Sequence, residues 1–108
     1  MTALTNSVQL IGRAGNDPEV KTVGKDRSML RFSLATSEYY YNEKGQRIET
    51  TQWHRVVAWG KLAERMGKQL KKGQMVAING KLVNNQWKDK DGSMRNLVEI
   101  VANEFMPA

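Results

Sequence analysis

Hydrophobic and polar residues alternate along most of this chain, which indicates β-strands. The clearest alternation lies in residues 29–41, where Leu30, Phe32 and Leu34 fall on one face at a spacing of two residues. A second alternation covers residues 50–59, which are rich in β-branched and aromatic side chains. The pattern predicts strands over residues 8–13, 29–41, 50–59, 75–83 and 94–101, with a hairpin turn at Asp91-Gly92 between residues 84–88 and 94–101.

One segment, residues 61–72, has the different spacing of an amphipathic helix. Leu62, Met66 and Leu70 recur every four residues and form a narrow apolar stripe. The residues predicted to face water are Glu64, Arg65, Lys68 and Lys71. Gly73 follows the segment, and a glycine at this place is typical of a left-handed helix stop.

The predicted order is three strands, one helix and two further strands. Five strands with one helix after the third are typical of the OB-fold, a five-stranded Greek-key barrel, although a small β-sandwich with one helix fits the same order. The length of 108 residues suits one domain, so we expect residues 1–108 to form a single all-β domain with one helix. OB barrels bind oligonucleotides or oligosaccharides across their second and third strands.

The chain is basic, with 17 Lys and Arg residues against 11 Asp and Glu residues, a net charge of +6 and a pI near 9.8. Such a surface attracts nucleic acid, anionic lipid or acidic partners. The absence of cysteine excludes disulfide bonds and thiolate metal clusters. No apolar stretch approaches the roughly 18 residues of a membrane span, and the first residues lack the pattern of a signal peptide. We therefore expect a cytoplasmic protein that does not contact the membrane.

The segment 53–59 carries two of the three tryptophans, and its residues alternate between two faces. The even-numbered face is small and mainly apolar, which is typical of a core. The odd-numbered face carries Trp53, Arg55 and Trp59, an unusual set for a surface that nothing covers. Single-stranded nucleic acid is a natural cover, because bases stack on aromatic rings and cations hold the phosphates. The alternative is that these rings pack at a subunit interface or cap the barrel.

Other aromatic residues also lie outside the expected core. Trp87 falls in the polar hairpin 84–89, and the three consecutive tyrosines at 39–41 cannot all be buried, since neighbouring side chains of a strand point to opposite faces. The cations that surround the aromatic residues are Arg31, Arg55, Lys61, Lys81, Lys88, Lys90 and Arg95. Together they are predicted to form a positive groove that follows a nucleic-acid backbone.

The residues do not indicate an enzyme. The single histidine, His54, falls on the apolar face of its strand, where a core or interface histidine is expected and not a general base. A metal nuclease needs clustered carboxylates. Asp17 and Glu19 instead flank a proline in a turn, and Asp89 and Asp91 fit the tip of a hairpin. The sequence also lacks a Gly-x-x-x-x-Gly-Lys-Ser/Thr phosphate loop, so we expect no catalytic residues, no cofactor and no metal.

Residues 51–64, TQWHRVVAWGKLAE, form the most distinctive stretch of the chain. This stretch resembles the third strand and the helix start of the bacterial single-stranded DNA-binding protein family. Further segments similar to that family are 10–13 (LIGR), 17–20 (DPEV), 34–38 (LATSE), 70–73 (LKKG), 87–89 (WKD) and 91–92 (DG). The resemblance covers residues 6–102, which is almost the whole chain.

The resemblance implies an OB-fold that is usually a homotetramer and that coats single-stranded DNA during replication, recombination and repair, in association with the nucleoid. The stacking positions of the family correspond to Trp53, Trp59, Trp87 and Tyr40. Tyr40 stands where tryptophan is common and Trp59 where phenylalanine is common, so both substitutions keep an aromatic ring. Arg55 and Lys61 match basic positions of the family beside these rings.

The family usually continues into a flexible tail rich in Gly, Pro and Gln, with an acidic, hydrophobic tip that recruits other replication proteins. Here the chain stops at residues 104–108, EFMPA, so we expect a tailless family member or a shortened chain, and no basis for tail-mediated recruitment. The alternative function is that of a dimeric accessory protein of the primosome, similar to the replication-restart family of OB-fold proteins. A tetramer favours the first function and a dimer favours the second.

Overall fold

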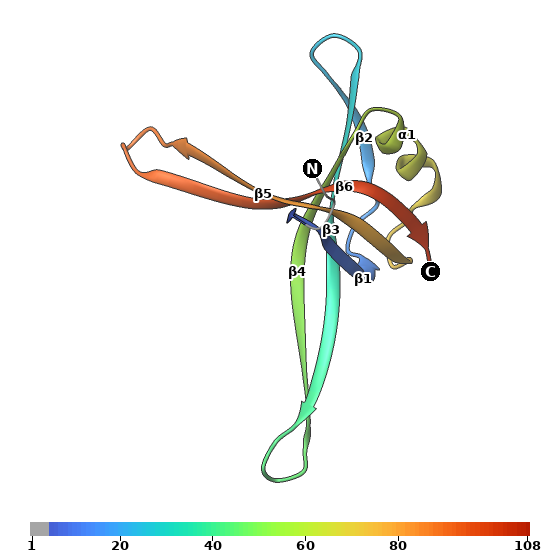
Figure 1. Cartoon of the computed structure of the whole chain (residues 1–108), viewed down its shortest axis with the longest axis vertical. Helices are drawn as coiled ribbons and strands as arrows, with labels where there is room; N and C mark the ends of the chain where they lie inside the picture. The colour runs from blue at the N-terminus through green and yellow to red at the C-terminus, as the bar shows by residue number, and fades with distance from the viewer. Residues whose placement is uncertain (1–4) are drawn as a thin grey trace.

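The computed structural model describes residues 5–108, which form six strands and one helix. In chain order the elements are β1 (Val8–Ala14), β2 (Glu19–Val23), β3 (Arg27–Tyr41), β4 (Arg47–Trp59), α1 (Gly60–Gln69), β5 (Met75–Lys88) and β6 (Met94–Pro107). Figure 1 shows these strands wound around one another, with α1 packed beside them and two long hairpins that project outward.

Five of the strands close into a barrel. The sheet order is β1-β5-β6-β4-β3-β2, and β1 pairs a second time with β3, so that β2 lies outside the ring. Two narrow seams close the ring, because β1 meets β3 over two residue pairs and β4 meets β6 in parallel over two pairs. Since α1 follows the third barrel strand, the predicted OB-fold architecture is confirmed, and the chain does not form a β-sandwich.

The barrel interior holds the hydrophobic core. Leu30, Phe32 and Leu34 of β3 and Val56 and Ala58 of β4 point inward and are buried, as the alternation predicts. Burial of each large side chain contributes about 1.5–3 kcal/mol to folding. The other buried members of the core are Ala14, Ala63, Met66, Leu70, Val76, Ile78, Ile100 and Ala102. Met66 and Leu70 belong to the predicted helix stripe, which therefore packs against the barrel.

The strand β2 is absent from the sequence prediction, which has no strand between residues 13 and 29. All five residues of β2 are exposed, and the strand pairs only with the first part of β3, which begins at Arg27. An edge strand without a buried face has no alternation of apolar and polar residues. A prediction that depends on such alternation therefore misses it.

The helix α1 ends at Gln69, three residues before the predicted end at Lys72. The following residue, Leu70, is already extended, with φ −100° and ψ 139°. The backbone N–H of Lys72 donates to Oδ1 of Asp17 at 2.7 Å, across 55 residues of sequence. Gly73, predicted as the helix stop, is instead the left-handed residue (φ 85°) of a separate turn. Lys72 thus lies outside the helix, and its amide is bonded to the turn after β1.

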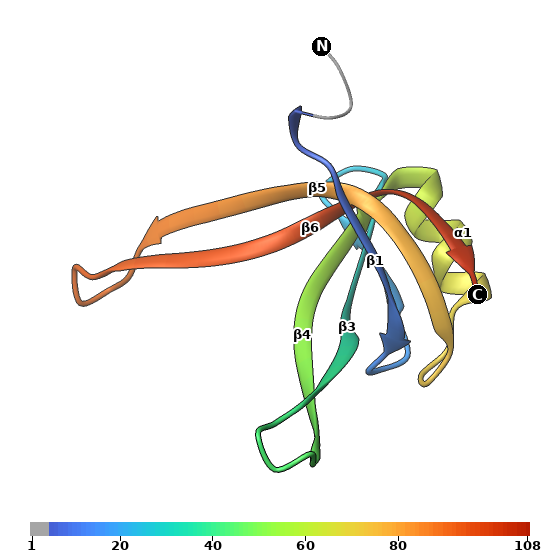
Figure 2. The same cartoon turned by 60° about the horizontal axis from the view of Figure 1, so that its bottom comes forward.

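Two hairpins extend beyond the barrel and are called arms below. The β3–β4 arm comprises residues 37–51 and the β5–β6 arm comprises residues 84–98, and neither contains a fully buried side chain. The second arm corresponds to the predicted hairpin between residues 84–88 and 94–101, but β5 runs unbroken from Met75 to Lys88 and has no break at residue 83. Figures 1 and 2 show the arms leaving the barrel in different directions, which makes the molecule 57 × 40 × 32 Å.

No helix within residues 5–108 is long and apolar enough to cross a membrane. The same residues contain no group of three or more His, Asp or Glu side chains that would hold a metal ion. The prediction that the chain starts without a signal peptide depends in part on residues 1–4, which lie outside the described residues.

Candidate nucleic-acid interface

The side of the barrel that faces away from the core carries several of the predicted binding residues in neighbouring rows. Arg31 of β3 lies opposite Val57 of β4, and Val57 lies beside Val101 of β6, so the outward rows of these strands are adjacent. The outward-facing residues of β6 in turn lie opposite outward-facing residues of β5, for example Leu97 opposite Asn85, so the face extends over four strands. This outer face is formed by Arg31, Ser33, Trp53, Arg55, Leu97, Glu99, Asn85 and Trp87.

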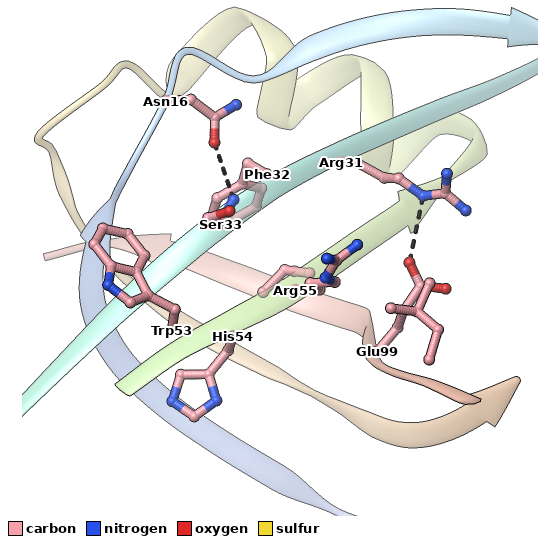
Figure 3. Close-up of a pocket in the computed structure, with 10 residues that line it drawn as sticks. Asn16, Arg31, Phe32, Ser33, Trp53, His54, Arg55 and Glu99 are labelled. Carbon is pink, nitrogen blue, oxygen red and sulfur yellow. Dashed lines mark hydrogen bonds and ion pairs between the residues drawn. The ribbon is translucent and has the colours of Figure 1, made fainter. Parts of the chain in front are cut away.

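A groove of about 490 Å³ crosses the outer face. Trp53, Arg55, Arg31 and Glu99 are among the residues that line it. In Figure 3 the Trp53 ring lies at one end, Arg31 with Glu99 at the other, and Arg55 between them. The groove therefore offers an aromatic ring followed by two guanidinium groups, a combination suited to a base and its flanking phosphates.

Trp53 is positioned by the loop after β1. Its side chain stays largely accessible, since the residue is 63% exposed, yet a Cβ at Gly15 would come within 2.5 Å of its ring. The Gly15 N–H donates to the Ser33 carbonyl at 2.7 Å, and the Ser33 N–H donates to Oδ1 of Asn16 at 3.0 Å. The backbone of the loop therefore packs against the six-membered ring of the indole. Neither Gly15 nor Asn16 is among the predicted site residues, because their contacts with β3 and β4 are not local.

The groove also contains a carboxylate that the sequence prediction missed. Glu99 is the only buried charged residue among residues 5–108. Its Oε2 lies 3.3 Å from Nε of Arg31, and its Oε1 accepts a hydrogen bond from Nδ2 of Asn85 at 2.9 Å. Figure 3 shows the ion pair with Arg31. The alternation in residues 94–101 gives no sign that this glutamate is buried.

Trp87 lies on the β5–β6 arm and is 47% exposed. It stands opposite Arg95, whose Nε lies 3.1 Å from Oδ2 of Asp89. Lys88 follows Trp87 near the tip of the arm, and Lys81 lies on β5 close to the barrel, both with exposed side chains. The arm therefore extends the outer face with one ring and several cations.

Trp59 and Lys61 are not brought together with Trp53. Trp59 is half-buried at the far end of β4, about 20 Å along the strand from Trp53 at the usual rise per residue. The guanidinium carbon of Arg27 lies 4.8 Å from the centre of its ring, and Val57 between the two tryptophans is buried. The predicted surface row of 53, 55, 57 and 59 is thus interrupted. Lys61 is exposed in the first turn of α1.

The three consecutive tyrosines lie on the β3–β4 arm, and the prediction that they cannot all be buried is confirmed, since all three are exposed. Tyr40 stands opposite Ile48, while Tyr39 and Tyr41 point to the other side of the hairpin. The rings of Tyr39 and Tyr41 meet edge to face at 6.1 Å, and the guanidinium carbon of Arg47 lies 4.2 Å from the centre of the Tyr39 ring. No ring or cation contact involves Tyr40 among residues 5–108.

His54 is half-buried, and its Nε2 lies 2.8 Å from Oγ1 of Thr36. This hydrogen bond accounts for the histidine without a catalytic role.

At the tip of the β5–β6 arm, Oδ1 of Asp91 accepts the N–H of Ser93 at 2.9 Å. The backbone hydrogen bond from Ser93, followed by the side-chain bond, holds the pKa of Asp91 below its usual value, as expected for a carboxylate that closes a turn.

Comparison with known proteins agrees with this geometry. Residues 5–107 match the model of the single-strand binding protein family. The chain is 44% identical over 100 residues to the single-stranded DNA-binding protein of Neisseria meningitidis, and this match spans 93% of the chain and 58% of that protein. It is 45% identical over 101 residues to single-stranded DNA-binding protein 1 of Chlorobaculum tepidum, across 93% of the chain and 62% of that protein.

The fold also matches a solved structure with bound DNA. The complex of the Plasmodium falciparum SSB with ssDNA superposes with a TM-score of 0.82 at 30% sequence identity, over 94% of this chain and 90% of that one. The chain covers less than two thirds of the length of the two bacterial relatives. The range matched by the family model, residues 5–107, contains the barrel and both arms.

Proposed function

The chain belongs to the single-strand binding protein family, and on this premise we propose that its outer face binds single-stranded DNA with little sequence preference. The observation that carries the proposal is the exposed Trp53 ring, packed against Gly15 and followed in the groove by Arg55 and Arg31. Membership of this family agrees with the prediction of a binding protein that is not an enzyme.

The proposed binding mode combines stacking with phosphate contacts. A base stacked on a ring contributes about 1–3 kcal/mol, and every base has a face that can stack, so the mode tolerates any sequence. Arg55 and then Arg31 would meet successive phosphates on one side of the stacked base, in the order in which they line the groove. Trp87, Lys81 and Lys88 would continue the path along the β5–β6 arm. We extend the proposal to protection of single strands in DNA replication, recombination and repair.

Fluorescence titration with oligo-dT tests this proposal. Binding should quench the tryptophan emission, and affinity should fall as salt increases. Trp53→Ala should weaken binding by about 5- to 150-fold, and Trp53→Phe should keep most of the affinity because it keeps a ring. Trp87→Ala should act in the same direction. The proposal fails if duplex DNA of equal length binds as tightly as the single strand, or if both alanine variants bind oligo-dT normally.

We also propose that the chain assembles into a homotetramer through a second surface, at the other end of the sheet. Ile11, Ala77 and Met106 lie side by side in one row across β1, β5 and β6, and Ile11 and Met106 are exposed. This apolar patch borders a hollow of about 530 Å³. Oδ1 of Asn79, in the next row of β5, is buried without a hydrogen-bond partner among residues 5–108. A second copy would cover the patch and supply a donor.

Light scattering tests the assembly. We expect a particle of about four times the 12.3 kDa chain mass, and a smaller one for Ile11→Asp, which places a charge in the apolar patch. Val23→Asp, an exposed valine on β2 away from the patch, is the matched control and should leave the mass unchanged. A dimer of the unaltered chain would instead support the alternative function as a primosome accessory.

A further inference from the structure

The buried carboxylate of Glu99 is unexpected in a groove that is proposed to receive phosphates. A negative charge at this place repels the ligand, and a buried charge is costly unless it is paired and hydrogen-bonded. The side chain of Glu99 is 5% exposed, whereas that of its partner Arg31 is 58% exposed. The pair thus joins a fixed, internal acid to a cation on the surface of the groove.

Both oxygens of the Glu99 carboxylate have a donor. Asn85 of β5 holds Oε1, and Nε of Arg31 holds Oε2, so the carboxylate links three strands of the outer face. The ion pair engages Arg31 at Nε. The terminal nitrogens of the guanidinium point away from Glu99 in Figure 3. A long arginine side chain that otherwise samples many rotamers is thereby fixed with its terminal donors exposed.

Arg31 also occupies a junction. It lines the groove that contains Trp53, and it lines a neighbouring hollow of about 480 Å³. The other residues that line this hollow are Asn16, Asp17, Glu19, Lys21 and Met29, so Arg31 and Lys21 are its cations beside two carboxylates. A strand that leaves the Trp53 groove toward β2 must pass this guanidinium. The direction in which Arg31 presents its donors would therefore affect how a phosphate is held at that point.

We propose that Glu99 is a positioning residue for DNA binding: it fixes the guanidinium of Arg31 so that the terminal donors meet a phosphate between the two hollows. This inference rests on the proposed function of the outer face. Glu99 does not contact the DNA in this account, and its contribution is made through Arg31.

The proposal predicts an effect opposite in sign to that of charge alone. Glu99→Gln removes a negative charge from the groove, so general electrostatics predicts tighter binding of oligo-dT. In this variant the Asn85 amide can turn and keep its hydrogen bond, but Arg31 then faces a neutral oxygen and loses the charge-assisted bond that holds its guanidinium. Arg31 becomes less fixed, and we expect binding to weaken by about 3- to 10-fold.

The control for the charge change is Glu43→Gln, at the exposed tip of the β3–β4 arm, which should bind equally well or slightly more tightly. A double-mutant cycle with Arg31→Ala separates positioning from a general structural defect. The effect of Glu99→Gln should disappear when Arg31 is already alanine. A defect in the barrel would weaken binding equally in both backgrounds. Tighter binding by Glu99→Gln, or an equal loss in both backgrounds, overturns the proposal.

A measurement on the unaltered chain keeps the test independent of whether Glu99→Gln folds. The Nε–H signal of Arg31 in NMR should exchange slowly with solvent in the free protein and shift when oligo-dT is added. Exchange as fast as in a short peptide would contradict the proposal.

If Trp53→Ala weakens binding while Glu99→Gln does not, only the positioning role fails. If the unaltered chain does not prefer single strands over duplex, the proposed function itself fails.

Discussion

The two arms present their aromatic and basic residues in partly similar and partly different ways. Each has one ring that contacts no other ring and no cation among residues 5–108, Tyr40 on the β3–β4 arm and Trp87 on the β5–β6 arm. Each also has one arginine with a partner inside the arm, because Arg47 lies over Tyr39 and Arg95 pairs with Asp89. The net charge differs: residues 37–51 contain two cations and three carboxylates (−1), and residues 84–98 contain three cations and two carboxylates (+1).

This difference separates the two contributions to the proposed binding. Stacking needs a free ring, and both arms supply one. Attraction of phosphates needs positive charge that is not already neutralised, and only the β5–β6 arm has an excess, through Lys88 and Lys90. We therefore expect the β3–β4 arm to act mainly by stacking, with little dependence on salt, and the β5–β6 arm to act by stacking and charge together.

The largest expected effect within the β3–β4 arm comes from Tyr40. Tyr40→Ala should weaken oligo-dT binding by about 5-fold or more, because it removes the free ring of the arm. Tyr39→Ala is the matched control and should have a smaller effect, since the Tyr39 ring is already packed against Arg47 and Tyr41. Fluorescence anisotropy of a labelled oligonucleotide measures both. If the two variants lose the same amount of oligo-dT affinity, a ring without internal contacts does not bind DNA better than a ring that is packed inside the arm.

The second effect concerns salt. Replacement of Lys88 and Lys90 by alanine should make the logarithmic salt dependence of binding less steep by about 0.7 for each phosphate contact that is lost. Between 50 and 200 mM salt, this corresponds to roughly threefold per contact. Lys44→Ala, on the arm with the negative net charge, should change the slope less. If Lys44→Ala flattens the slope as much as either replacement in the β5–β6 arm, the arms do not differ in the proposed way.

A smaller effect concerns the tip of the β3–β4 arm. Oδ1 of Asn42 accepts the backbone N–H groups of Lys44 at 3.0 Å and Gln46 at 2.9 Å. Asn42→Ala should destabilise the tip by about 0.5–1.5 kcal/mol and accelerate hydrogen exchange of these two amides about 2- to 10-fold. Asn96→Ala, on the other arm, is the control and should not affect them. Unchanged exchange rates after Asn42→Ala would show that water bonds to the two amides as well as the side chain does, so that the tip keeps its stability.

The smallest effect is the pH dependence of the β5–β6 turn. Because hydrogen bonds from Ser93 lower the pKa of Asp91 in the folded chain, the ionised carboxylate stabilises the turn at neutral pH. This stabilisation is present above the ordinary carboxyl pKa of about 3.9 and is lost as the pH falls through the lower folded value. NMR titration of the Asp91 carboxyl should give a midpoint below 3.8, and Ser93→Ala should raise it. A midpoint at or above 3.8 would contradict the turn role.

The sequence predicts those features of the molecule that depend only on the alternation of residues within a single strand. The core face of β3 was predictable because Leu30, Phe32 and Leu34 repeat at the period of a half-buried strand. Trp53 and Arg55 were predictable as neighbours because they share one face of one strand. The predicted continuation to Trp59 was only partly right, because the alternation cannot show that Val57 is covered by neighbouring strands.

The remainder of the site depends on contacts between distant segments. Arg31 and Glu99 belong to β3 and β6, and Glu99 is indistinguishable in sequence from an ordinary surface glutamate between apolar neighbours. Gly15 supports Trp53 only because barrel closure brings the loop after β1 onto β4. The hydrogen bond of the Lys72 amide after α1 has the same origin, since its acceptor, Asp17, is 55 residues away in sequence. Local patterns contain no information about such pairs.

The two arms also affect how the size of the molecule is measured. The radius of gyration is 16.2 Å, whereas a compact domain of this length has roughly 13 Å. A gel-filtration column calibrated with compact proteins would therefore overestimate the mass of a single chain.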